Sequence, residues 1–521
     1  MRLLDTQPLV RLRNEFRLSM RRLLTDLCRE LHAEHADLTG ELCLPTGLFE
    51  RLRSRFALEA YSNWKVVGWI ETLNDLVYFF DVLKQWKLEQ DRADFTEQLF
   101  DECQEKFFEH GYCDDLFPTG KAQVNGFEKR LYDLCRSLSK ELTQESLWFD
   151  PAESVTWCRK RKLPRWEAWG TLTDNFEKAE IPGTLTIDHT GAWCQAPDDL
   201  RRALSQSVGH VVFLVEPTRV SVRIGKSFSP IWSGRGAQGQ WQWVYHSPRI
   251  AIQTDRYSIT VGPTLVYGKD RRPRSVKTTD RRQVDRLARA WQTIQLAWPE
   301  GHEILALLTS RIIPLQAKGV VSFSYRHRPG LSFINCFDRD NLDLIDDLIH
   351  ENSHHQLNLL LRKYVMYRGD HHQQIFYSPW RRSLRPLRGI LHATFTFTMG
   401  ALLFERLSFW ASGRGGAERW KKAGLSKRDL QRARFRCLEE IESVRYSLQD
   451  LRYADCHLGW LTGSGRRLVA QLAEAIDEVE LRGNQFKHDV EHSQSGSALR
   501  KHSKELHRAR QVYGPMRLGK V

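Results

Sequence analysis

One segment in the second half of the chain joins a metal-ligand spacing to the pattern of a buried helix. Residues 344–361 read LIDDLIHENSHHQLNLLL, and positions 350–354 form an HExxH motif. On an α-helix, residues four apart lie on the same face, so His350 and His354 can direct both imidazoles at one ion. Apolar side chains surround the motif, which predicts a buried helix. Because buried polar groups need partners, a metal ion would satisfy both histidines and the neighbouring carboxylate.

The third ligand of such a metal is open between two residues. Two imidazoles suit zinc, iron, nickel or copper rather than calcium or magnesium. The next helix is predicted at 389–410. Glu405 is its only acidic residue, and His392, near the start of the helix, is the rival candidate. The alternative for His392 is a core histidine bonded to a backbone carbonyl. Two loop histidines rank below both candidates, His371 and His372.

A loop rich in arginine precedes that second helix. Residues 377–389 read YSPWRRSLRPLRG, where tryptophan and proline stiffen the chain. Guanidinium groups bind carboxylates through two parallel hydrogen bonds. The loop can therefore hold an anionic co-substrate beside the metal, and a solvated basic loop is the alternative. The arginines are Arg381, Arg382, Arg385 and Arg388.

The periodicity of apolar residues predicts an α+β fold that is predominantly helical. Three- and four-residue spacing predicts a helical region over 1–150, and alternation predicts a β-rich region over 151–275 with a central antiparallel segment. Residues 276–416 are expected to form the HExxH metal-binding core. Residues 417–521 are expected to be helical, with a polar, basic and loosely structured end after Gly483.

Composition limits the class of protein and its surroundings. A chain of 521 residues is expected to form about two to four domains. Ten cysteines without a CxxC pair exclude a thiolate zinc site and favour reduced thiols. No signal peptide is apparent, and the longest uncharged stretch, 389–404, falls short of a membrane span. These features predict a cytoplasmic protein that neither crosses nor enters a membrane.

Residues 285–410 resemble the family of HExxH-motif peptide-modification proteins, some of which are 2-oxoglutarate-dependent peptide β-hydroxylases. The resemblance rests on IIPLQ, then SFSYRHRPGLSFIN, then LIHENSHHQLN, and then YSPWRRSLRPLRGILHATFTF. Its most specific elements are Pro-Trp-Arg and Arg-Pro-Leu-Arg-Gly followed by Leu-His. The remaining three quarters of the chain show no such resemblance.

The resemblance implies a site and a reaction. It implies Fe(II) held by His350 and His354, with His392 as third ligand. It also implies 2-oxoglutarate held by an arginine of the loop, in the order Arg388, Arg385 and Arg381. Glu351 would then act as a base or support the ligands. The implied function is an Fe(II)/2-oxoglutarate-dependent oxygenase that hydroxylates a side chain of a peptide or protein, of the type that matures ribosomal peptide natural products.

Two other functions compete with this one. In a zinc metallopeptidase, Glu351 would be the general base that activates a zinc-bound water, with Glu405 as third ligand. In a non-enzymatic peptide-binding protein, the metal would be structural. The metzincin continuation, a P-loop and a GxSxG element are absent, and the basic clusters lack an aromatic platform for nucleic acid.

The net charge suggests what kind of peptide would bind. The chain carries a net charge of +14, concentrated in part at 269–289 and 500–521. A positive surface favours acidic partners, so a peptide substrate with an acidic leader is expected. Solvated charge is the alternative for both stretches. The sequence does not determine the substrate or the oligomeric state.

Overall fold

A computed structural model describes most of the chain. It covers residues 3–145, 166–171, 210–275, 281–413 and 415–513, with gaps in the first range (43, 45, 56–57, 90–96, 100 and 104–123) and in the third (217, 225, 236–239, 244–249, 254–257, 262–264 and 268–272). Contacts divide the chain into two compact units. Unit 1 comprises Met1–Phe16, Ile250–Gly262 and Thr279–Val521, and unit 2 comprises Arg17–Arg249 and Pro263–Thr278.

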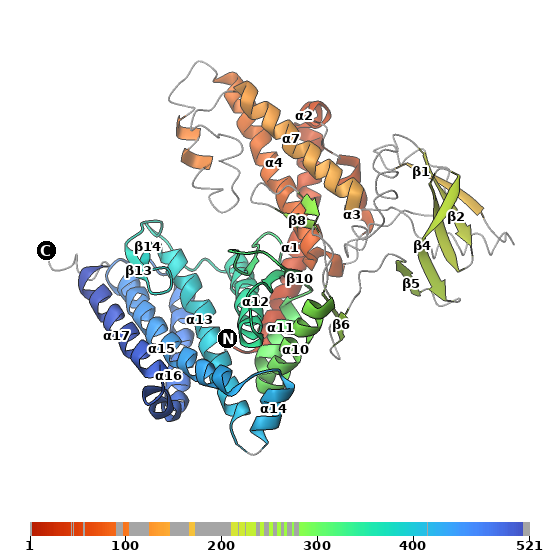
Figure 1. The fold of residues 1–521 in the computed structure, drawn as a ribbon. Coiled ribbons are helices and arrows are strands. Elements are labelled where there is room, and N and C mark those ends of the chain that lie inside the picture. Colours follow the sequence, from red (N-terminus) through yellow and green to blue (C-terminus); the bar gives the residue numbers. More distant parts are fainter. Residues whose placement is uncertain are drawn as a thin grey trace. The chain divides into compact units, whose positions relative to one another are not determined.

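Unit 2 combines a helical part with an antiparallel sheet (Figure 1). Its helices are the greater part of α1 (Thr6–Glu34), α2 (Ala36–Glu41), α3 (Thr46–Arg55), η1 (Leu58–Ser62), α4 (Trp64–Leu88) and α7 (Val124–Glu145). The sheet has the order β1-β2-β3-β4-β5, formed by Trp166–Thr171, His210–Glu216, Arg219–Ile224, Ser227–Arg235 and Gln240–Trp243. Two further strands pair with each other, β8 (Leu265–Tyr267) and β9 (Pro273–Ser275).

Helix α4 is the centre of the helical part of unit 2. The Asn63 side chain accepts a hydrogen bond from the Lys65 backbone N–H and so caps its N-terminus. Aromatic and aliphatic residues are buried on all sides of the helix, which is typical of a helix enclosed by others. The largest buried rings on it are Trp64, Trp69, Phe79 and Trp86.

Unit 1 contains the HExxH segment and all the helices after residue 280. They are α10 (Arg281–Ala297), α11 (Pro299–Leu308), α12 (Asn341–Lys363), α13 (Leu387–Ala411), α14 (Gly416–Lys422), α15 (Lys427–Cys456), α16 (Gly463–Glu491) and α17 (Ser495–Val512). Its mixed sheet has the order β11-β12-β10-β7-β6, formed by Phe323–Ser324, Leu331–Asn335, Arg311–Leu315, Ser258–Val261 and Ile250–Gln253. A short hairpin joins β13 (Phe376–Ser378) to β14 (Ser383–Arg385).

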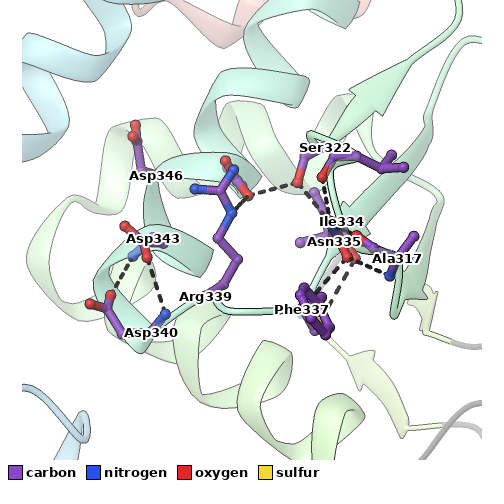
Figure 2. A network of polar contacts seen from close by, with 12 residues as sticks. Ala317, Ser322, Ile334, Asn335, Phe337, Arg339, Asp340, Asp343 and Asp346 are labelled. Atoms are coloured by element: carbon purple, nitrogen blue, oxygen red, sulfur yellow. Dashed lines mark hydrogen bonds and ion pairs between the residues drawn. The ribbon is translucent and has the colours of Figure 1, made fainter.

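The start of α12 is fixed by hydrogen bonds that the local sequence supplies. Asp340 and Asp343 form a capping box, in which each side chain accepts from the other residue's backbone N–H (Figure 2). The Ser322 hydroxyl donates to Asp347 over 2.6 Å and ties the helix to the chain before β11. The Asn335 amide donates to the Ala317 carbonyl at the end of β12. The N-cap of α12 is therefore Asp340.

Helix α13 is the core helix that carries His392, and it packs against α12, α15 and α16. By length and composition this helix is apolar enough to cross a membrane, but 72% of its apolar 18-residue segment is buried inside the protein. That burial is typical of a core helix.

The end of the chain corrects one expectation. Residues 484–512 are not loosely structured, because α16 continues to Glu491 and α17 covers Ser495–Val512. Polar contacts hold α17 against α15: Ser503 donates to Glu442, and Ser443 pairs with His502 over 2.9 Å. Polar composition suggested disorder, but these side chains bond to a neighbouring helix.

The observed architecture is an α+β fold that is predominantly helical, as expected. The antiparallel sheet β1–β5 lies within the expected β-rich region. The four expected regions fall into two units, and unit 1 combines the HExxH core, the C-terminal helices, and short pieces from the N-terminus and from the β-rich region. The N-terminal piece bonds to α12, since Gln356 donates to the Leu3 carbonyl over 2.9 Å.

Candidate metal centre

Helix α12 brings the two motif histidines together. The ring centroids of His350 and His354 are 5.0 Å apart, and the rings are nearly perpendicular at 82°. The ligand atoms of His350, Glu351 and His354 all lie within 4.8 Å of one another. Metal ligands at about 2 Å from an ion are separated by about 3–4 Å, so small side-chain rotations would complete a site.

His392 approaches this pair from α13. Its ring centroid is 6.2 Å from that of His354, and the two rings are inclined by 32°. Two imidazoles bound to one ion at the tetrahedral angle have centroids about 5 Å apart, by the metal–nitrogen distance and ring size. His392 is therefore about 1 Å too far for coordination, and it lies outside the compact group formed by His350, Glu351 and His354.

The protein environment keeps the motif histidines neutral. Burial lowers the pKa of His350, and the charges of Arg436 and Arg381 lower it further, although Asp346 opposes them. Burial also lowers the pKa of His354 well below its ordinary value, aided by His350 and His392. A histidine must be neutral to bind a metal, so this environment suits a cation that replaces the lost solvent.

Glu351 is a buried carboxylate beside the histidines. Burial raises its pKa to about 8, while a hydrogen bond from Ser324 opposes the shift. Its Oε2 atom makes no hydrogen bond within the part of the chain that the structure describes. A buried carboxylate oxygen without such a bond costs free energy, and a cation or a proton would remove that cost.

A polar network behind His350 was not predicted from the sequence. Phe397 of α13 lies edge-on to His350, with ring centroids 5.2 Å apart, and stacks on Trp380. The Trp380 indole N–H donates to Glu440 of α15 over 2.8 Å. Glu440 in turn accepts from Arg436 over 2.8 Å.

The same network also contacts α12. The Arg436 guanidinium is 3.5 Å from the carboxylate of Asp346, one turn before His350. Burial raises the pKa of Glu440 to about 7, and Arg436 and Trp380 oppose that shift. Asp346 and His350 are four residues apart, and this spacing, visible in the sequence, places them on one face of the helix. The residue that pairs with Asp346, Arg436, comes from α15, far along the chain.

Asn352, Ser353 and His355 hold the helix in place rather than face the metal site. Asn352 donates to the Thr309 hydroxyl over 2.9 Å, and Ser353 donates to the His350 carbonyl over 2.6 Å. His355 is fully enclosed, so burial lowers its pKa to about 4. It accepts from the Gly330 N–H and therefore donates through Nε2 to Ser332, which fixes a neutral ring on β12.

The arginine loop divides into different environments. Arg381 follows the β13 strand, and its charge lowers the pKa of both motif histidines, which places it near them. Arg388 lies on the first turn of α13, one turn before His392 on the same face. Arg385 is exposed on β14, and Arg382 is exposed with its guanidinium 3.4 Å from Glu505.

Glu405 does not lie at the site. It accepts a 2.7 Å hydrogen bond from Arg482 of α16, and its second oxygen is 3.3 Å from Arg406. By the helical rise per residue, it is about 20 Å along α13 from His392. This placement removes Glu405 from the set of candidate ligands.

The loop histidines His371 and His372 lie against each other, with ring centroids 4.0 Å apart.

The residues present fit a first-row transition metal. Neutral imidazoles, a buried carboxylate oxygen without a hydrogen bond, and a third imidazole nearby make a nitrogen-rich donor set that suits iron or zinc better than calcium or magnesium. Comparison with protein-family models and with curated proteins finds no match to this chain.

Proposed function

We propose that this protein is an Fe(II)- and 2-oxoglutarate-dependent oxygenase that hydroxylates a side chain of a peptide or protein. The observation that supports it most is the approach of His392 to His354, with centroids 6.2 Å apart, while Glu405 is engaged elsewhere. His392 is about 1 Å beyond coordinating distance, so a small movement of its side chain would bring a third imidazole to the metal, whereas Glu405 lies about 20 Å from His392 along α13.

The chain's own residues hold and orient the reactants. His350, His354 and His392 would hold the iron, and their environment keeps the two motif rings neutral. When bound, iron and 2-oxoglutarate supply the oxidising chemistry, and the protein positions the peptide beside them. The network from Phe397 through Trp380 to Glu440 would hold the ring of His350 in place.

Positive charge on one side of the centre supports binding of a dicarboxylate. Arg388 shares a face of α13 with His392, so an anion held by Arg388 would lie within reach of the metal. Arg381 acts on both motif histidines and adds positive charge there. A guanidinium binds a carboxylate in a bidentate manner, which would fix the orientation of 2-oxoglutarate. Arg381 and Arg385 are both exposed, but Arg385 is not among the charges that shift the pKa of the motif histidines, so it is the weaker candidate.

A zinc hydrolase is the second candidate, and the position of Glu351 favours it. Its carboxylate belongs to the same compact group as the two motif histidines, and its pKa is raised to about 8. Such a group can accept a proton from a metal-bound water. In this function His392 rather than Glu405 would be the third ligand.

The proposal also includes a substrate peptide with an acidic leader and a cytoplasmic location. An acidic leader would suit the net charge of +14, although the basic stretches at 269–289 and 500–521 lie only partly within the described residues. A cytoplasmic location is expected with reduced thiols, and four of the described cysteines are free: Cys28, Cys336, Cys437 and Cys456.

Consumption of 2-oxoglutarate separates the two functions. The full-length chain, loaded with Fe(II) without oxygen, is exposed to air with 2-oxoglutarate, and succinate is measured. Slow succinate formation without a peptide is expected, because oxygenases of this kind turn over uncoupled. Succinate formation that is no faster than with the His350→Ala variant, together with zinc-dependent hydrolysis of peptides, would establish the hydrolase instead.

A further inference from the structure

A second group of possible metal ligands lies in unit 2, on elements that the HExxH site does not use. Glu30 is on the last turns of α1, His35 lies between α1 and α2, and Asp81 is on α4. One ligand atom from each lies within 4.8 Å of the other two. Three elements separated in sequence thus bring an imidazole and two carboxylates together.

His35 is the distinctive member of this group. Its side chain has no exposed surface, and it packs beside Phe80 with ring centroids 5.6 Å apart. Neither ring nitrogen makes a hydrogen bond within the described residues, although Nε2 is 3.4 Å from Asp81 Oδ1. A buried imidazole directed at a carboxylate without a hydrogen bond is a costly arrangement unless something else satisfies it.

The backbone at His35 explains how the ring reaches the carboxylates. His35 has φ −127° and ψ 19°, outside the helical region, and its side chain makes no capping hydrogen bond to α2. Helix α1 ends at Glu34 and α2 begins at Ala36. The break frees His35 from helical side-chain directions, so it can face Asp81 of α4.

The charges around the group favour a cation. Burial raises the pKa of Glu30, and the nearby carboxylates of Asp81 and Glu34 raise it further, since like charges are crowded there. Lys84 is the opposing positive group, and its ammonium donates to the Glu34 backbone carbonyl. The charges of Lys84 and Glu34 offset each other. The carboxylates of Glu30 and Asp81, with a neutral His35 imidazole, then leave the site with a net negative charge.

We propose that Glu30, His35 and Asp81 form a second metal site, for a divalent first-row transition ion of the zinc class. The 3.4 Å between His35 Nε2 and Asp81 Oδ1 matches the edge of a tetrahedron with metal–ligand bonds of about 2.05 Å. The imidazole favours zinc, cobalt or nickel over calcium and magnesium. Asp81 is 58% exposed, so solvent can supply the fourth ligand.

The test uses the full-length chain with the HExxH site silenced by His350→Ala and His354→Ala. After loading with Zn²⁺ or Co²⁺ and removal of free metal, metal content is measured by mass spectrometry and cobalt coordination by visible absorption. About one bound ion per chain is expected, with the absorption of tetrahedral cobalt. Adding Asp81→Asn or His35→Ala should remove it, because each variant deletes one ligand.

The matched control is His32→Ala, which removes an exposed histidine from the last turn of α1. It should leave the second ion in place. Asp81→Asn changes an exposed side chain, so it tests the site even where His35→Ala disturbs folding. The proposal is overturned if the silenced chain binds no metal, or if Asp81→Asn and Glu30→Gln retain all of it with an unchanged cobalt spectrum; an ion pair between His35 and Asp81 would then be the whole role of the group.

Discussion

The rings of His354 and His392 lie 6.2 Å apart between centroids, although they come from different helices. This relationship distinguishes a three-histidine site from one that would use Glu405. His392→Ala should lower the affinity of the full-length chain for Fe(II) by roughly 100-fold or more, because it removes a ligand rather than a supporting contact. The measurement is an anaerobic titration with Fe(II).

Glu405→Gln is the matched control for that titration. It changes a carboxylate on the same helix that bonds to Arg482 rather than to the motif histidines. Metal affinity should stay within about twofold of the wild type. Stability should fall by only about 1 kcal/mol, because Arg482 is 34% exposed and solvent screens its charge. A large loss of metal affinity in Glu405→Gln, with none in His392→Ala, would reverse the assignment.

Arg388 is expected to bind the carboxylate of 2-oxoglutarate. Arg388→Ala should raise the KM for 2-oxoglutarate by about 10- to 100-fold, which corresponds to loss of a charge-assisted hydrogen bond of about 1.5–3 kcal/mol. Metal content should be unchanged. Arg382→Ala is the control, because Arg382 is exposed near Glu505. Equal KM values for Arg388→Ala and Arg382→Ala would remove Arg388 from the co-substrate site.

The contact between Trp380 and Glu440 should contribute to stability and to the placement of His350. Trp380→Phe keeps an aromatic ring against Phe397 but removes the indole N–H that donates to Glu440 over 2.8 Å. We expect a loss of about 1–3 kcal/mol in the free energy of unfolding, because a buried carboxylate loses a partner. Denaturant unfolding measures it. A variant as stable as the wild type would show that water replaces the indole.

Asp340 should make stability depend on pH. Burial favours its neutral form, but hydrogen bonds from Arg432 and from the backbone of Asp343 and Leu342 outweigh burial, so the pKa lies below its ordinary value of 3.8. For a carboxyl with a lowered pKa, the stabilisation is present above the unfolded pKa and is lost as the pH falls through the folded pKa.

Asp340→Asn isolates that charge, because asparagine also caps helices. The side chain is 43% exposed, so the variant should lose only about 0.5–1 kcal/mol at pH 7. The difference from the wild type should shrink below pH 3.8, the ordinary value of this carboxyl. Melting temperatures between pH 7 and pH 3 measure it, and a difference that grows in acid would contradict the ion pair.

Local signals in the sequence predicted the elements that carry the motif. The HExxH helix and the following apolar helix formed as expected, because apolar periodicity and capping act over a few residues. The choice between His392 and Glu405 required knowledge of which neighbour each face of α13 meets. The packing of α12 against α13 brings His392 near His354, and the packing of α16 brings Arg482 to Glu405.

Other parts of the site depend on contacts that no local pattern specifies. Trp380 meets Glu440 only because α15 packs against α13 and the β13–β14 hairpin. His35 meets Asp81 through a break between two helices, and this spacing matches no metal-ligand motif. The polar end of the chain resembled a disordered tail, because composition does not reveal that Ser503 bonds to Glu442.

The most direct test of the HExxH site is metal analysis of the anaerobically purified full-length chain. The wild type should retain iron, and His350→Ala and His354→Ala should each lose it from this site, whereas Glu405→Gln should keep it. Because Glu30, His35 and Asp81 are proposed to bind a second ion, all variants are compared in a background that carries Asp81→Asn. Full iron content in both histidine variants would contradict a metal held between α12 and α13.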